Sequence, residues 1–201
     1  MTDIRDLNAR AVRDSMEIVR QVQVTDLARQ TPCAGWTLAD LLGHMTVQHH
    51  GFAAAARGDG ADLKHWEFAP AGADAVQQYL AACDVVLTAY ADLDDGLDAL
   101  LDLPEFKINP PRFPAHTAIG FHFIDYVVHA WDVAATLGIG YELPPELAET
   151  ALKISLAVPN GANRKAVGSA FIPALATPED ASVLDKVLLH LGRQPDWRPT
   201  A

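Results

Sequence analysis

Apolar residues recur at helical intervals along most of the chain. In the N-terminal segment they repeat every three or four residues, at Ile4, Leu7, Ala11, Val12, Ile18, Val19 and Val22. The same period, broken by glycine and proline, predicts six helices, at about residues 3–29, 37–57, 73–93, 115–137, 144–158 and 178–191. No long run alternates between apolar and polar residues as a half-buried strand does. The chain is therefore predicted to be all-α.

The lengths of these segments indicate how the helices are arranged. Four long helices with one long crossover predict a four-helix bundle over about residues 3–138, with a short helical extension over about residues 144–201. No strong linker separates the two parts, so we expect one domain over residues 1–201. The connection 94–114 holds four prolines, and connections of this length are uncommon unless they have a role such as covering a site.

The second helix presents a histidine on its polar face. Thr37 is predicted to cap this helix, with Asp40 as the acidic partner three residues later. His44 follows in the second turn, and Gln48 lies one turn further along the same face. His49 comes close to the end of the helix and is expected to face solvent.

The fourth helix carries a narrow polar stripe in an otherwise apolar sequence. His122, Asp125, His129 and Asp132 fall within a sector of about 80°. One interpretation is a plain solvated face, with Asp125 paired to His129 across one turn. Such a face usually carries Lys, Glu and Arg, and this stripe has none of them. Short carboxylates and imidazoles instead indicate metal binding or acid–base chemistry.

Three of these side chains form a metal-ligand pattern. Asp125 and His129 are four residues apart on one helical face, and His44 supplies a histidine from another helix. Two ligands from one helix and one from a second helix can build an open metal site in a bundle, with a coordination position left for water, a thiolate or a substrate. His122 or Asp132 could orient a ligand, and Gln48 and Arg164 are further candidates for the surroundings of the metal or the substrate pocket. For Arg164 a plain surface position is the simpler expectation.

Composition excludes several classes of partner. The chain has 201 residues, of which 50% are apolar and 20% charged, as expected of a globular protein. A net charge of −11 argues against nucleic acid or an anionic membrane as the main partner. The apolar stretch 118–139 carries two histidines and two aspartates, which favours a buried helix over a membrane span. The N-terminus lacks an apolar signal core, so a cytoplasmic location is expected.

The two cysteines do not indicate a disulfide framework. Cys33 and Cys83 are too few for a set of disulfides, and their spacing is not that of a metal site. Cys33 precedes the second helix and could be activated by its N-terminus, although a small buried residue at a turn is the simpler expectation.

Three segments resemble one protein family. TPCAGWTLADLLGH, residues 31–44, resembles the segment TPCxxWTVxDLLxH, and DYVVHAWDVA, residues 125–134, is similar to ExxxHGWDLA. The C-terminal FIP and GRQPDW resemble an FxP stretch and a closing GRxPxW. These motifs are typical of the actinobacterial DinB-like metal-binding proteins related to the N-terminal domain of mycothiol-dependent maleylpyruvate isomerase. The resemblance covers nearly the whole chain.

The resemblance implies a DinB-like four-helix bundle that holds one divalent metal ion, most often zinc, with nickel or iron as alternatives. The ligands carried over from the motifs are His44, Asp125 and His129. Asp125 stands where the family usually has Glu. Because Asp is one methylene shorter, either the helices lie closer together or the carboxylate binds the metal through water.

The function implied is a metal-dependent thiol transferase or isomerase, with mycothiol as the small-molecule thiol and a small electrophile as substrate. The isomerase has a larger C-terminal domain that contributes to its active site, and only about sixty residues follow the fourth helix here, so we do not infer maleylpyruvate isomerase activity. Two alternatives remain: a metal-assisted hydrolase without a thiol, with His122 as general base, and a non-catalytic binding module with or without metal. A homodimer is compatible with the sequence.

Overall fold

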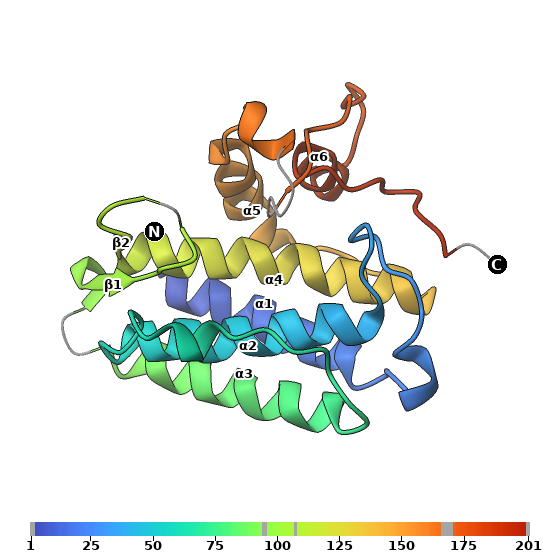
Figure 1. Cartoon of the computed structure of the whole chain (residues 1–201). Coiled ribbons are helices and arrows are strands. Elements are labelled where there is room, and N and C mark those ends of the chain that lie inside the picture. Colours follow the sequence, from blue (N-terminus) through green and yellow to red (C-terminus); the bar gives the residue numbers. More distant parts are fainter. Residues whose placement is uncertain (1–2, 94–95, 107, 166–170, 200–201) are drawn as a thin grey trace.

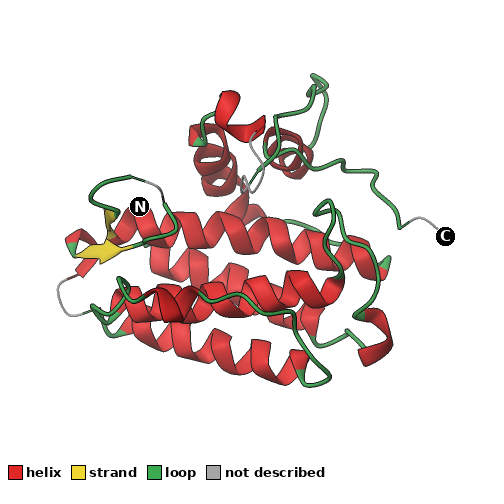
Figure 2. Ribbon diagram, viewed as in Figure 1, coloured by secondary structure: helices red, strands yellow, loops and turns green. Residues whose placement is uncertain are grey.

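The computed structural model describes residues 3–93, 96–106, 108–165 and 171–199. These ranges contain six α-helices: α1 (Ile4–Val19), α2 (Leu38–Ala56), α3 (Ala75–Ala91), α4 (Ala115–Leu137), α5 (Pro145–Ala157) and α6 (Val183–His190). They also contain two short strands, β1 (Leu100–Asp102) and β2 (Arg112–Pro114). Figure 2 shows that helices dominate the structure. The predicted all-α class and the helical bundle are confirmed.

The first four helices form a bundle in which each helix contacts two neighbours. α1 packs against α4 and α3, and α2 packs against the same two helices (Figure 1). The consecutive helices α1 and α2 therefore lie on one diagonal, and α3 and α4 on the other. α2 and α4, which carry the predicted metal ligands, are neighbours. No described helix is both long and apolar enough to cross a membrane.

The first helix is shorter than predicted. α1 ends at Val19, and residues 24–26 form a separate 3-10 turn. That turn is closed by its own cap, because the Asp26 carboxylate accepts a hydrogen bond from the backbone N–H of Gln23. Val22 still packs in the core although it lies outside the helix. The position of Val22 in the apolar pattern therefore indicates that it is buried and not that it is helical.

The paired strands were not predicted. β1 and β2 are antiparallel, with Leu101 opposite Phe113, and they lie beside the start of α4 (Figure 2). Each strand has three residues, which is too short for an alternating pattern to be recognised. The pairing brings together the two ends of residues 103–111 and so shapes the long connection.

The C-terminal extension packs on the bundle through a shared apolar core. α5 and α6 contact each other, and α5 lies against α4 (Figure 1). One apolar cluster joins side chains of α1, α4, α5 and α6, among them Ala11, Val127, Trp131, Leu147 and Leu188.

Arg164 belongs to the structure of this extension. It is buried, and its guanidinium donates hydrogen bonds to the carbonyls of Val158, Pro159 and His190, which join the end of α5 to the end of α6. The expected surface position is therefore wrong. No described hydrogen bond connects Arg164 to the predicted ligands, so a role in the substrate pocket finds no support.

A chain of buried hydrogen bonds crosses all four helices of the bundle. His122 on α4 donates from Nδ1 to Asn8 Oδ1 on α1 (2.7 Å), and its Nε2 lies 3.1 Å from Nδ1 of His49 on α2. Nε2 of His49 in turn lies 3.2 Å from the thiol of Cys83 on α3. Because an amide oxygen only accepts, neutral rings require His49 to donate to His122 and Cys83 to donate to His49.

All four members of this chain are fully buried. The expectation that His49 faces solvent is therefore wrong. The two rings are neutral, because burial lowers the pKa of His122 to about 3 and that of His49 well below its usual value. Buried polar groups are stable when each finds a partner, and here the partners come from different helices.

Replacing His122 by Phe tests this network. The change leaves Asn8 Oδ1 and His49 Nδ1 buried without partners, so we expect a loss of about 2–4 kcal/mol in the free energy of unfolding. Urea unfolding followed by circular dichroism measures it. His116→Phe, at an exposed position of the same helix, should change the value by less than about 0.5 kcal/mol. Equal stability of the two variants would contradict a stabilising role.

The same histidines predict acid lability. Each is neutral when folded but titrates near 6.5 when unfolded, so the unfolded state binds more protons below that pH. The stability is complete above pH 6.5 and falls as the pH drops toward 3, by up to about 1.4 kcal/mol per pH unit for each histidine. Urea unfolding at pH 7, 6 and 5 in the presence of a chelator should show this slope. The slope should be smaller in His122→Phe, and an unchanged slope would speak against the assignment.

Candidate metal centre

Three predicted ligands converge where α2 and α4 face each other. Nε2 of His44 lies 3.8 Å from Oδ2 of Asp125, and Nε2 of His129 lies 3.3 Å from Oδ1 of the same carboxylate. One ligand atom from each residue lies within 4.8 Å of the others. Ligand atoms on a tetrahedral zinc ion are about 3.3 Å apart, since each bond is 2.0–2.1 Å long. The donor set therefore fits a single divalent metal ion.

The short side chain of Asp125 reaches both imidazoles. Its two oxygens face His44 and His129 separately, so this carboxylate lies near both imidazoles without the extra methylene of Glu. This geometry favours direct ligation over ligation through water.

The polar stripe of α4 is buried, and the alternative of a plain solvated face is wrong. His129 and Asp132 are 4% and 0% exposed. Asp132 Oδ2 accepts a hydrogen bond of 2.8 Å from Nδ1 of His129, which leaves Nε2 facing Asp125. A carboxylate behind a ligating histidine fixes the ring and makes it a better donor to a metal. The orienting role predicted for Asp132 therefore has the required contact, whereas His122 faces the buried network with both ring nitrogens engaged.

The electrostatics of the centre favour one positive charge between the three ligands. Burial lowers the pKa of His44 to about 4. Burial would also lower the pKa of His129, but the carboxylates of Asp125 and Asp132 outweigh it and raise that pKa well above its usual value. Burial would raise the pKa of Asp125, and the neighbouring histidines lower it instead. Such a site stabilises a proton or a metal cation.

Two residues without a predicted role at the site stand behind Asp132. Arg193, from the segment after α6, donates from Nη2 to Asp132 Oδ2 (3.3 Å) and to the sulfur of Cys33 (3.3 Å). The Cys33 thiol also donates to Asp132 Oδ2 (3.3 Å), and Cys33 is half-buried and not a fully buried turn residue. Their sequence signals were the TPC and GRQPDW motifs and, for Cys33, its position before the second helix. The C-terminal extension thus reaches the centre through Arg193.

An aromatic surface borders the site on the side of His44. The ring of Trp36 lies 5.0 Å from the imidazole of His44, and Phe68 stacks on Trp36 at 6.2 Å with an interplanar angle of 19°. Phe68 comes from a segment that packs closely on α2: a Cβ on Gly43 would lie 2.2 Å from the carbonyl oxygen of Ala69. Glycine at position 43 is therefore what allows this segment to lie beside His44.

An acidic residue borders the site from the long connection. Gln48, one turn after His44, donates from Nε2 to Oε2 of Glu105 (2.9 Å). Much of the Glu105 residue is exposed to solvent, but its carboxyl group lies against the protein. Partial desolvation of this carboxyl and the charge of Asp125 raise its pKa to about 7. Glu105 was not predicted from the sequence, although the connection 94–114 was expected to cover a site. Its position follows from the β1–β2 pairing, which the sequence did not reveal.

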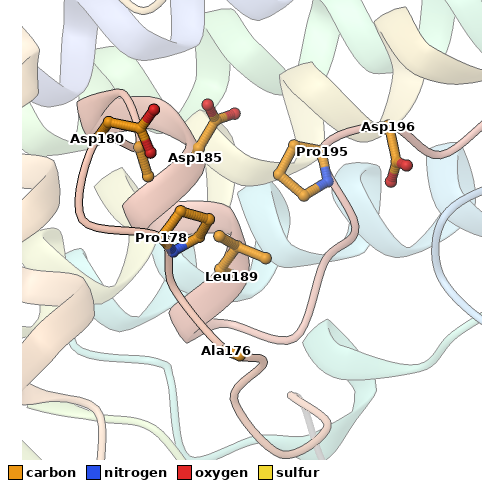
Figure 3. A pocket seen from close by; sticks show the side chains of 8 residues that line it. Ala176, Pro178, Asp180, Asp185, Leu189, Pro195 and Asp196 are labelled. Carbon is orange, nitrogen blue, oxygen red and sulfur yellow. The ribbon is translucent and has the colours of Figure 1, made fainter.

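Other hollows lie elsewhere. A cavity of about 380 Å³ in the C-terminal extension is lined by Pro178, Asp180, Asp185, Leu189 and Asp196 (Figure 3). Asp59, Asp62 and His65 also group their ligand atoms within 4.8 Å, but on the exposed loop after α2. None of the predicted site residues belongs to either group, so the centre between α2 and α4 remains the candidate site.

Comparison with known proteins identifies the family. Residues 9–134 match the model of the mycothiol maleylpyruvate isomerase N-terminal domain, a range that contains all three candidate ligands. The chain belongs to this family. The expected relationship is therefore confirmed.

Similar sequences and structures agree with this assignment. An uncharacterized protein of Mycobacterium tuberculosis, matched in two strains, is 27% identical over 180 residues, which cover 88% of this chain and 90% of the relative. Crystal structures of the mycothiol-dependent maleylpyruvate isomerase and of a histidine-to-alanine mutant match with TM-scores of 0.65 and 0.67 at 13% identity. Both matches cover 100% of this chain and 95% of the other. The matched region includes the C-terminal extension of this chain. The larger C-terminal domain that was expected of the isomerase is therefore not a difference in fold between the two chains.

Asp132→Asn tests the support behind His129. The amide keeps the size of the side chain but loses its charge, so we expect metal affinity to fall by about 10–100-fold. Competition with a chromogenic chelator measures the affinity, and circular dichroism checks the fold. Asp102→Asn, at a strand carboxylate paired with Arg112, serves as the matched control. Unchanged affinity in Asp132→Asn would show that this carboxylate does not orient the ligand.

Proposed function

We propose that this protein is a divalent-metal-dependent enzyme that adds a small thiol of the mycothiol type to a small electrophile, as a transferase or an isomerase. The observation that carries the proposal is the convergence of His44, Asp125 and His129 from two helices, with the far nitrogen of His129 held by Asp132. Three protein ligands leave a coordination position for a reactant. Catalytic zinc sites use two histidines and a carboxylate with an open position, so zinc is the expected metal, with nickel and iron as alternatives.

Each part of the site has a role in this proposal. A bound divalent metal would lower the pKa of a thiol that reaches it, so that the sulfur becomes nucleophilic at neutral pH. Asp132 holds His129 in one ring orientation, and Arg193 balances the charge of Asp132. Trp36 and Glu105 border the space that the reactants would enter. The family relationship supports mycothiol as the thiol, because the family is named for a mycothiol-dependent enzyme.

The hydrolase alternative loses its expected base. In that alternative His122 was to accept a proton from metal-activated water. Its two nitrogens are instead used by Asn8 and His49 in the buried network. A general base must lie within hydrogen-bonding reach of the proton that it removes. We therefore place thiol addition first.

Metal content and thiol binding test the proposal. We expect protein purified without a metal-affinity tag to hold about one divalent ion per chain, measured by elemental analysis. His129→Ala should lose the ion because it removes one of three ligands. His116→Ala, an exposed histidine on the same helix, is the matched control and should keep it.

The thiol is tested on the same samples. Calorimetric titration should show mycothiol binding to metal-loaded wild type and to His116→Ala, but not to His129→Ala or to chelator-treated protein. Metal that stays in His129→Ala would show that the ligand set is wrong. Full metal occupancy without thiol binding would overturn the thiol-transfer part of the proposal.

A further inference from the structure

The surroundings of the metal centre are acidic. Glu105 lies beside the site, where its carboxylate accepts a hydrogen bond of 2.9 Å from Gln48, one turn after His44. The site therefore carries a carboxylate that no metal ligand neutralises. A divalent metal ion would be balanced by the charges of Asp125 and a thiolate, so the Glu105 carboxylate would remain as a negative charge that repels an anionic substrate.

No free cation offsets this charge within the described part of the chain. Arg193 is 7% exposed and already bound to Asp132 and Cys33, on the far side of His129 from the other ligands. Among the described residues, no other arginine or lysine forms a hydrogen bond or an ion pair with the three candidate ligands or with Glu105. A carboxylate on the substrate would thus find no free arginine or lysine at the centre among the described residues.

The aromatic surface offers a complementary contact. Phe68 is 50% exposed although it is large and apolar, and it stacks on Trp36, which touches His44. This pair lies directly beside the centre, and the close approach at Gly43 holds its segment in place. A flat apolar group can stack on such a surface, and aromatic pairs contribute about 0.5–1.5 kcal/mol beyond the area that they bury.

We propose that the electrophile is an uncharged molecule with a flat aromatic or conjugated part, which Trp36 and Phe68 hold while Glu105 disfavours anions. This inference rests on the proposed thiol transfer. It assigns an uncharged substrate class, in contrast to a carboxylate-bearing substrate such as maleylpyruvate.

An activated aryl chloride is a suitable probe of this class. The sulfur of the thiolate attacks the ring carbon that carries chlorine, a C–S bond forms, and chloride leaves with the electron pair of the C–Cl bond. The thiol proton goes to the buffer, and no oxidant or reductant is needed. Methyl 4-chloro-3,5-dinitrobenzoate and the free acid share ring and leaving group and differ in charge.

The test compares these two probes with metal-loaded enzyme and mycothiol at pH 8. After division by the uncatalysed rates, we expect kcat/KM for the ester to exceed that for the acid by about tenfold. Glu105→Gln should reduce this ratio to about threefold by raising the rate with the acid. Phe68→Ala should raise KM for the ester by about fivefold.

Matched controls are Glu149→Gln and Leu63→Ala, both at exposed positions. Neither should change the ratio or KM. Equal rates with both probes, or a preference for the acid, would overturn the inference and leave thiol transfer standing. The inference is likewise overturned if metal and mycothiol bind but neither probe reacts. Absence of mycothiol binding would instead overturn the proposed function, and the inference with it.

Discussion

The hydrogen bond between His49 and His122 is the contact on which the geometry of the centre depends. It joins α2 to α4 at 3.1 Å in the middle of the bundle. On α2, His49 lies five residues after His44. On α4, His122 lies five residues before position 127, which is midway between Asp125 and His129. On antiparallel helices both intervals equal about 7.5 Å. The register that allows the two buried rings to meet is therefore the register that places the three candidate ligands together.

The ends of this chain of hydrogen bonds extend the constraint to the whole bundle. Asn8 on α1 and Cys83 on α3 complete the hydrogen bonds, and a bond between Ser15 and Tyr79 joins the same two helices again. Apolar packing alone tolerates sliding between helices, whereas a buried donor without an acceptor is costly. The polar core thus selects one arrangement, and the C-terminal extension adds a second restraint through Arg193, Asp132 and His129.

The sequence predicted what depends on local periodicity and missed what depends on tertiary contacts. The capping box of Thr37 and Asp40, the limits of α2 and α4, and a shared face for Asp125 and His129 all follow from neighbours in the chain, and the structure contains them. The burial of His49 could not be read from its position near a helix end, because its partners come from α3 and α4. Glu105 and Arg193 reach the centre from segments whose paths are set by strand pairing and by the packing of α6. Metal occupancy itself stays a prediction.

The border of the site explains why family membership does not name the substrate. The candidate ligands lie on helices, but Phe68 and Glu105 lie on connections, and connections change more readily than the elements they join. At 13% identity the isomerase structure shares the fold with this chain, and a shared fold leaves the chemistry at the border open. Selection for a different electrophile could therefore act on the segments around residues 68 and 105 without disturbing the helices that carry the candidate metal ligands. The charge and aromatic character of that border are consequently the features from which the substrate class is to be inferred.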